Sequence, residues 1–290
     1  MPAGPGGPAP GRAGAGAATE GLGGTQVEGV RAVEELLVAR RRRVREVWLA
    51  EGPSAAGARI ARLAREAGVV VRTVSRDRLV AEARTEAPQG VLARADPVPA
   101  VDLDELWAPA GPERAALVVA CDGITDPHNL GAVLRTAECA GATGAVLARH
   151  RAVHLSPAAT KAAAGAVEHL PLALAGGIPA ALARAREAGL WLVGLAADGD
   201  RSIDDLGPGG LDLAGTGLVV VLGSEGRGLS RLARQRCDVV VAIPLAGALP
   251  SLNVGAAAAV ALFSIARARA LGPSPGRRAG RDDRGDVKEG

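Results

Sequence analysis

The sequence predicts an α/β protein made of a small N-terminal unit and a larger C-terminal unit with a parallel sheet. Helix-like and strand-like segments alternate along residues 26–97 and again along residues 115–271. The strands expected in the second unit are continuous apolar runs, such as LVVA at 117–120, which is typical of a parallel sheet covered on both faces. With 290 residues, of which 48% are hydrophobic, the chain is long enough to form two cores.

The first unit, residues 26–97, is expected to contain three helices and three strands. Apolar residues at helical spacing indicate its first helix, and Ser54 is a suitable N-cap for its second. The predicted order is helix 27–40, strand 44–50, helix 54–68, strand 69–74, helix 75–84 and strand 89–95. With 14 arginines against 10 acidic residues, this unit carries the positive excess of a chain whose net charge is +3, which favours an anionic partner weakly.

The segments outside the two units differ from them in composition. Residues 1–25 and 272–290 are predicted to be disordered tails, and the Pro-rich, acidic residues 98–114 a linker that Trp107 anchors. No apolar run is long enough for a membrane span, and the N-terminus lacks the apolar core of a signal peptide, so we expect a cytoplasmic protein. Three widely spaced cysteines and four histidines without a ligand pattern indicate free thiols and no metal site.

The second unit, residues 115–271, is expected to be a sheet of parallel strands joined by helices. The predicted strands are 115–124, 144–150, 171–175, 190–197, 217–222 and 238–246. The predicted helices are 129–141, 156–170, 178–189, 230–237 and 251–270, with Ser156 as N-cap of the second and Pro157 at its first position. Ligands of such sheets bind at the carboxyl ends of the strands.

Polar residues gather after three of these strands. Asn129 and Arg135 follow the first strand, Glu225 lies in the glycine-rich loop GSEGRG, and Ser251 and Asn253 precede the last helix. Each group has a structural explanation when taken singly: an N-cap with a surface ion pair of Arg135, a tight turn, and a helix cap at Ser251. None of the loops has the spacing of a P-loop or of a dinucleotide-binding fingerprint, which argues against a Rossmann-type methyltransferase or NAD enzyme.

Taken together, the three segments resemble the motifs of the SpoU (TrmH-type) RNA 2′-O-ribose methyltransferases of the SPOUT class. The first motif, Asn-x-Gly-x-x-x-Arg, is matched by Asn129, Gly131 and Arg135. The second and third motifs are matched by Gly223, Glu225, Gly226, Gly228, Ile243, Pro244, Gly247, Ser251, Leu252, Asn253 and Val254. Leu245 and Gly255 depart from the usual residues of the third motif. The first unit looks like the substrate-binding domain of the ribosomal-RNA guanosine enzymes, with Pro88 in place of the family's His.

The resemblance implies a SPOUT domain with a trefoil knot, preceded by a small α/β RNA-binding domain similar to ribosomal-protein folds. It implies a homodimer that binds S-adenosyl-L-methionine and RNA and methylates a ribose 2′-hydroxyl, with a guanosine of 23S ribosomal RNA as the expected target. A transfer-RNA methyltransferase, an antibiotic-resistance ribosomal-RNA methyltransferase and a non-catalytic RNA-binding relative stay open as alternatives.

The same resemblance assigns roles to individual residues. The expected catalytic residues are Asn129, Arg135, Glu225, Ser251 and Asn253. The expected cofactor-binding residues are Gly223, Gly226, Ile243 and Leu252. Because the chain has one Phe and no Tyr for base stacking, RNA binding is expected to rely on arginine–phosphate contacts, with candidates Arg41, Arg42, Arg43 and Arg45.

Overall fold

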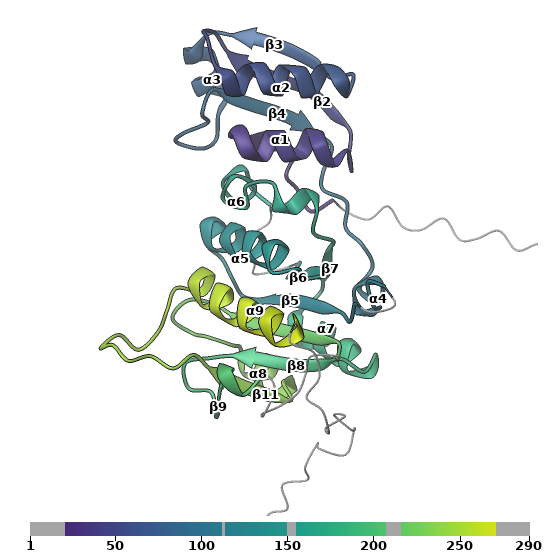
Figure 1. Ribbon diagram of the computed structural model, residues 1–290, viewed down its shortest axis with the longest axis vertical. Helices are drawn as coiled ribbons and strands as arrows, with labels where there is room; N and C mark the ends of the chain where they lie inside the picture. Colours follow the sequence, from purple (N-terminus) through teal and green to yellow (C-terminus); the bar gives the residue numbers. More distant parts are fainter. Residues whose placement is uncertain (1–20, 112–113, 150–154, 207–215, 271–290) are drawn as a thin grey trace, which may run out of the picture.

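The computed structural model describes residues 21–111, 114–149, 155–206 and 216–270. It contains two β-sheets stacked along the long axis of the molecule, with the N-terminal sheet at one end (Figure 1). The predicted tail 272–290 and residues 1–20 of the predicted tail 1–25 lie outside the described residues.

The N-terminal sheet has four strands in the order β1-β4-β2-β3, and its only parallel pair is β2–β3. Its strands are β1 (Gln26–Glu28), β2 (Val44–Ala50), β3 (Val70–Val74) and β4 (Val91–Ala95). Helices α1 (Val30–Ala39) and α2 (Ala55–Glu66) pack on one face, and α3 (Arg76–Glu82) packs on the other around Trp48. The sequence did not predict β1, since three residues carry too little periodicity to reveal a strand.

The C-terminal sheet has seven parallel strands in the order β7-β6-β5-β10-β8-β11-β9. They are β5 (Leu117–Asp122), β6 (Gly144–Ala148), β7 (Leu172–Ala175), β8 (Trp191–Leu195), β9 (Arg201–Ser202), β10 (Leu218–Gly223) and β11 (Val239–Ala242). The parallel sheet predicted from the apolar runs is confirmed. The trefoil knot stays a prediction of the family resemblance.

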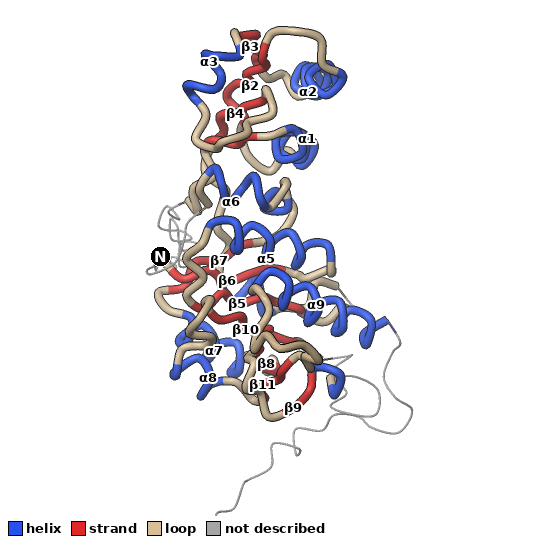
Figure 2. Tube along the Cα trace, turned by 90° about the vertical axis from the view of Figure 1, so that its left-hand side faces the viewer, coloured by secondary structure: helices blue, strands red, loops and turns tan. Residues whose placement is uncertain are grey.

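Helices cover both faces of this sheet, as its two-sided apolar strands require (Figure 2). One face carries α5 (Pro127–Cys139), α6 (Pro157–Ala162), the short 3₁₀-helix η1 (Ala166–Glu168) and α9 (Val254–Ala270). The other face carries α4 (Leu103–Trp107), α7 (Ile178–Glu187) and α8 (Arg231–Arg236), and a second 3₁₀-helix, η2 (Ile203–Asp205), follows β9. Neighbouring residues of β5 alternate between the faces: Val119 and Cys121 face α5, whereas Val118 and Ala120 face α7.

The single helix predicted for residues 156–170 is wrong in its second half. Ser156 caps α6 as predicted, its hydroxyl accepting the Ala159 amide at 3.2 Å, but the helix ends at Ala162. Ala164 and Gly165 then take positive φ angles of 48° and 94°, and the chain turns into η1. An α-helix cannot continue through two residues in the left-handed conformation, so a turn and η1 take the place of the last two turns of the predicted helix.

The segments that join the two sheets are better ordered than their composition indicated. Residues 21–25, predicted as part of the tail, run alongside the linker: the Leu22 side chain is 1% exposed, and the Leu22 amide donates to the Val98 carbonyl at 3.0 Å. Within the linker, Trp107 of α4 is buried against the C-terminal sheet, which confirms that it anchors this segment. The free energy gained by burying an apolar side chain orders a segment whose Gly-rich or Pro-rich sequence would otherwise favour disorder.

The cysteines are free thiols, as predicted, and two of them are shielded. Burial, with the charge of Asp122 or Asp238 adding to it, raises the pKa of both Cys121 and Cys237 to about 12. Among the described residues, no helix is long and apolar enough to cross a membrane.

Candidate active site

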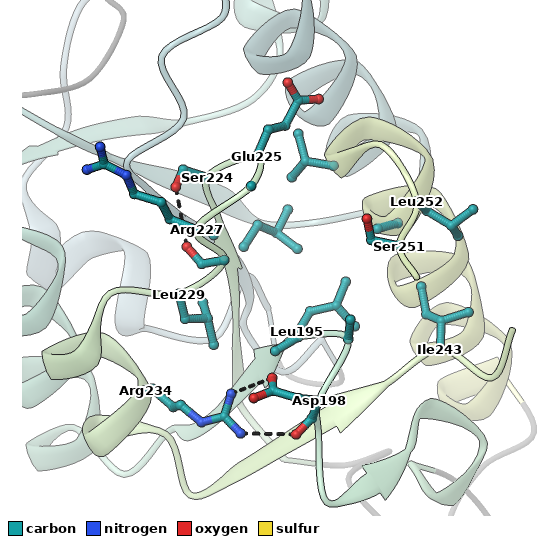
Figure 3. A pocket seen from close by; sticks show the side chains of 18 of the residues that line it. Leu195, Asp198, Ser224, Glu225, Arg227, Leu229, Arg234, Ile243, Ser251 and Leu252 are labelled. Carbon is teal, nitrogen blue, oxygen red and sulfur yellow. Dashed lines mark hydrogen bonds and ion pairs between the residues drawn. The ribbon is translucent and has the colours of Figure 1, made fainter. Parts of the chain in front are cut away.

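The carboxyl ends of four neighbouring strands meet at one edge of the C-terminal sheet. The register pairs Gly223 at the end of β10 with Asp122 of β5, and Leu195 of β8 lies opposite both Leu222 and Val241. The segments that follow three of these strands, β8, β10 and β11, line a cavity of about 520 Å³ (Figure 3). A cavity at this edge is where a parallel α/β sheet is expected to bind a ligand.

The glycine-rich loop after β10 forms the first wall of the cavity. It closes on itself through two backbone hydrogen bonds between Ser224 and Gly228, of 3.0 and 2.9 Å. A side chain on Gly223 would overlap the backbone of Gly228 and Leu229, so only glycine lets the loop fold back over the strand. The tight turn is therefore present, and it exposes backbone polar groups to the cavity.

The segment between β11 and α9 forms the opposite wall. All four predicted cofactor-binding residues, Gly223, Gly226, Ile243 and Leu252, line the cavity from these two walls. Further apolar side chains line it as well, namely Leu195, Leu222, Leu229, Leu245 and Val254. The lining thus combines an apolar surface, suited to a flat heteroaromatic base, with backbone donors and acceptors that can orient a polar ligand.

A polar network at the rim joins the three loops. The Asn253 side-chain amide donates to Asn129 Oδ1 at 2.9 Å and to Glu225 Oε1 at 2.7 Å. Asn253 Oδ1 accepts the Gly255 amide at 2.8 Å and so caps α9, whereas Asp126 caps α5 by accepting the Asn129 amide. The structural explanation considered for Asn129, a helix cap, is therefore wrong, and its side chain takes part in the network instead.

Ser251 is not a helix cap. Helix α9 begins at Val254, and its cap is Asn253, so the structural explanation considered for Ser251 is wrong. The side chain of Ser251 is exposed, lines the cavity beside Leu252 (Figure 3), and makes no hydrogen bond to another described residue. Its hydroxyl is available to a ligand.

Arg135 lies away from this cavity. Two turns beyond Asn129 on α5, it lines a separate cavity of about 260 Å³, together with Arg31, Glu138 and His169. Arg135 is exposed, and its guanidinium forms no hydrogen bond or ion pair with a described residue, so the ion pair considered for it is absent. The structure brings together four of the five predicted catalytic residues within one chain, and Arg135 is the one left out.

This arrangement agrees with a comparison against families of known proteins. A model of the SpoU rRNA Methylase family matches residues 116–263, which contain every element of the cavity. The chain belongs to the SpoU rRNA methylase family. A second model, described as RNA 2'-O ribose methyltransferase substrate binding, matches residues 26–101.

Individual relatives extend the match over most of this SpoU protein. It is 38% identical to the 23S rRNA (guanosine-2'-O-)-methyltransferase RlmB of Pseudomonas putida, over 84% of this chain and 96% of the relative. It is 34% identical to the putative TrmH family tRNA/rRNA methyltransferase YacO of Bacillus subtilis, over 84% and 95% of the two chains. Among solved structures, the SpoU methyltransferase AviRb from Streptomyces viridochromogenes, in complex with AdoMet, is similar with a TM-score of 0.68 and 27% identity, over 85% and 91% of the two chains.

An ion pair that the sequence did not predict also lines the cavity of this SpoU protein. Arg234 of α8 donates to the Asp198 carboxylate at 2.7 Å and to the Asp198 carbonyl at 3.1 Å (Figure 3). The hydrogen bond from Arg234 holds the pKa of Asp198 below its usual range, so the cavity has an ionised carboxylate after β8. An Asp-Gly pair directly after a parallel strand was the available signal.

The arginines predicted to bind RNA have three different environments in this SpoU chain. Arg42 is wrong as an RNA contact, because its side chain is 2% exposed and ion-paired with Glu168 between the two sheets. Arg41 donates to backbone carbonyls near Glu168 at 3.4 Å. Arg43 and Arg45 are exposed, and Arg45 pairs with a carboxylate at 2.8 Å. Arg43 and Arg45 stay predictions, since surface exposure alone does not show what they bind.

Proposed function

We propose that this protein transfers a methyl group from S-adenosyl-L-methionine to the ribose 2′-hydroxyl of a guanosine in 23S ribosomal RNA. The observation that carries the proposal is the network of Asn129, Glu225 and Asn253 beside the glycine-walled cavity, which unites three motifs far apart in the sequence. The names of the curated relatives support the target, and the match of residues 26–101 to a substrate-binding model supports RNA as the partner. We place the reaction in the cytoplasm.

The cavity suits S-adenosyl-L-methionine in size and chemistry. Its volume of about 520 Å³ lies inside the range of about 300–1,000 Å³ typical of small-molecule sites. Leu195, Ile243 and Leu252 supply apolar surface for the adenine, and the loop beginning at Gly223 supplies backbone groups for the polar parts. The ionised Asp198 can accept hydrogen bonds from hydroxyls or from an ammonium group.

When bound, this cofactor supplies an electrophilic methyl group on a sulfonium, so the protein has to orient the ribose hydroxyl and remove its proton. Asn129 and Asn253, held together by Glu225, are placed to orient the hydroxyl at the rim. The Ser251 hydroxyl, which has no hydrogen-bond partner among the described residues, is placed to relay the proton: it accepts the proton of the 2′-hydroxyl as it donates its own proton to water. A guanidinium group is a hydrogen-bond donor and not an acceptor, so the role of Arg135 is to stabilise the negative charge developing on the 2′-oxygen rather than to act as base.

We further propose that the protein acts as a homodimer in which Arg135 of one subunit serves the cavity of the other. Arg135 is exposed and outside its own chain's cavity. The outward face of α9, which packs beside α5, presents an uncharged stripe of Ala256, Val260 and Phe263, with Val260 39% and Phe263 46% exposed. An apolar face on the helix beside α5, together with an arginine on α5 that pairs with no described residue, favours a partner subunit at this place.

The reaction is tested with purified protein, radiolabelled S-adenosyl-L-methionine, and unmodified 23S ribosomal RNA or transfer RNA as acceptor. We expect label in one guanosine ribose of the ribosomal RNA, mapped by resistance to alkaline cleavage. Label in transfer RNA alone would show that the target is transfer RNA and not ribosomal RNA, an activity that the name of the B. subtilis relative also includes. No transfer to either RNA would refute the proposed function.

The dimer is tested by complementation between two inactive variants, Arg135→Ala and Ser251→Ala. Each variant alone is expected to lose at least about 100-fold in kcat, since each lacks a group that acts on the reacting oxygen. Co-expressed chains pair at random, so half the dimers are mixed and each mixed dimer has one intact site. The mixture should regain about a quarter of the wild-type activity. No recovery would mean that each site is built from one chain.

A further inference from the structure

We propose that Arg42 and Glu168 are positioning residues: their buried ion pair holds the N-terminal domain in one orientation over the catalytic domain, so that bound RNA presents its ribose to the cavity. The part that concerns RNA rests on the proposed function. The part that concerns orientation rests on contacts between the domains alone. Here the N-terminal domain means residues 26–95 and the catalytic domain residues 117–270.

The ion pair is inaccessible on both sides. The side chains of Arg42 and Glu168 are each 2% exposed, and two parallel hydrogen bonds of 3.0 and 2.5 Å join the guanidinium to the carboxylate. The remaining terminal nitrogen of Arg42 donates to the Gly24 and Asp96 carbonyls, both at 2.6 Å. One side chain of the N-terminal domain therefore joins the catalytic domain to the two segments that flank residues 26–95, with a geometry that only arginine can provide.

The chain crosses between the domains twice, and the two crossings are paired. Leu22 and Val98 exchange backbone contacts through Leu22 N to Val98 O at 3.0 Å and Val98 N to Gly23 O at 2.9 Å. The Gly24 amide also donates to Leu155 of the catalytic domain at 2.7 Å. Two paired crossings resist rotation better than one flexible linker, and Arg42 binds the carbonyls at the point where both crossings end.

Three further contacts hold α1 and the loop before β4 against the segment from α6 to η1. Gly165 has φ 94°, and a side chain there would overlap Glu35 of α1, so the missing side chain lets the helix approach. His169 pairs with Glu35 at 3.0 Å. The Lys161 ammonium donates to the Ala87 carbonyl at 2.5 Å. The turn that the sequence concealed within one long helix is thus the docking surface for the N-terminal domain.

The docking surface rests directly on the helix that carries the catalytic motif. In Figures 1 and 2, α1 lies over α6, and α6 lies over α5. A side chain on Gly131 of α5 would come within 2.5 Å of the Ala162 side chain and 2.6 Å of the Ala159 carbonyl of α6. Because α5 and α6 pack in such close contact, α6 cannot shift against α5. The position of the N-terminal domain is therefore fixed relative to Asn129 and Arg135 on α5.

The energetics of a buried ion pair favour a role in orientation over a role in stability. Removing two charges from water offsets much of their attraction, so apolar replacement of both members of a buried ion pair often leaves stability unchanged. A bidentate pair nevertheless permits one geometry, whereas two apolar side chains permit several. The pair is therefore expected to select one arrangement of the domains.

The orientation is tested by the distance distribution between two spin labels in the full chain. Labels are attached at Val80→Cys in α3 and Leu232→Cys in α8, which are 55% and 59% exposed, with Cys139 replaced by alanine and labelled chains diluted with unlabelled ones. We expect one narrow peak for the wild-type pair and a distribution at least about twice as broad for the double variant R42M/E168M. Arg59→Met, which removes an exposed arginine pairing inside the N-terminal domain, is the matched control.

The effect on the reaction is measured with the same variants and 23S ribosomal RNA. For R42M/E168M we expect KM for RNA to rise on the order of tenfold, kcat to stay within about twofold, and cofactor affinity to stay unchanged, because preorganisation for RNA is lost and the cavity is intact. An unchanged distance distribution, or a broadened one with unchanged KM, overturns the inference. If the double variant does not fold, Lys161→Met is expected to show the same changes, and their absence counts against the proposal equally. Should wild type transfer no methyl group, the proposed function fails while the distance measurement still decides the orientation.

Discussion

Replacing Asn253 by aspartate separates the two roles of this side chain, as the cap of α9 and as the hydrogen-bond donor of the rim network. Its Oδ1 caps α9 by accepting the Gly255 amide at 2.8 Å, and its amide group donates to Asn129 and Glu225 at 2.9 and 2.7 Å. Aspartate keeps the cap, since Asp and Asn are equally good N-caps, but it cannot donate. It also sets a second carboxylate beside Glu225. At about 4 Å, such a pair repels by about 1 kcal/mol in water and about 4 kcal/mol near a protein surface.

The expected result is a stable protein with a disordered rim. Because Asn253 and Glu225 are exposed, their side chains can move apart and relieve the repulsion without unfolding the chain, so Asn253→Asp should unfold within about 2 °C of wild type. Asn253→Ala, which loses the cap at a cost of about 1 kcal/mol, should unfold about 2–4 °C lower. The rate of methyl transfer by Asn253→Asp should fall at least about tenfold. A displaced network that raises the activation free energy by only about 1.4 kcal/mol already lowers the rate by that factor. Thermal denaturation followed by circular dichroism and transfer of radiolabelled methyl to RNA measure the two effects. Wild-type activity in Asn253→Asp would refute the role assigned to the network.

Two other changes test the cavity and the core. Gly223→Ala should reduce cofactor affinity at least about tenfold by calorimetry, because the new side chain overlaps Gly228 and displaces the cavity wall; unchanged affinity would show that the loop can yield. Burial raises the pKa of Cys121 from 9.0 to about 12, so the thiol's contribution to stability is complete below pH 9 and is lost as the pH rises toward 12. In urea titrations the free energy of unfolding should fall by up to about 1.4 kcal/mol per pH unit for this thiol, and Cys121→Ala should have a shallower slope. The chain has no tyrosine to obscure the effect, and equal slopes would contradict the assignment.

Most of the helices and strands could be predicted from the sequence, because their signals are local. The apolar run of β10 and the cap at Ser156 depend on neighbours within a few residues, and both are found where the pattern put them. The misses are short or turned segments. The strand β1 has three residues, and the break at Gly165 reflects the approach of α1, which no local pattern records.

The candidate site divides in the same way. Gly223, Ile243 and Leu252 could be assigned from motif order, and they line one cavity. The family motifs group Asn129, Glu225 and Asn253, but no local pattern shows which side chains meet, since the two partners of Asn253 are 124 and 28 positions away. Nor could Asp198, whose significance depends on Arg234 closing over it from another helix.

The sequence by itself determined the composition of each loop and the alternation that builds a parallel sheet, because hydrophobic period and turn chemistry act over a few residues. Only the tertiary structure decided which side chains meet. It shows that Ser251, a possible cap by sequence, has a hydroxyl that bonds to no described residue, and that Arg42, expected on an RNA-binding surface, forms a buried ion pair with Glu168. The physical reason is that exposure and pairing are set by elements distant in the chain. A run of arginines has the same local sequence pattern whether its side chains face solvent or one of them pairs with a carboxylate 126 residues away.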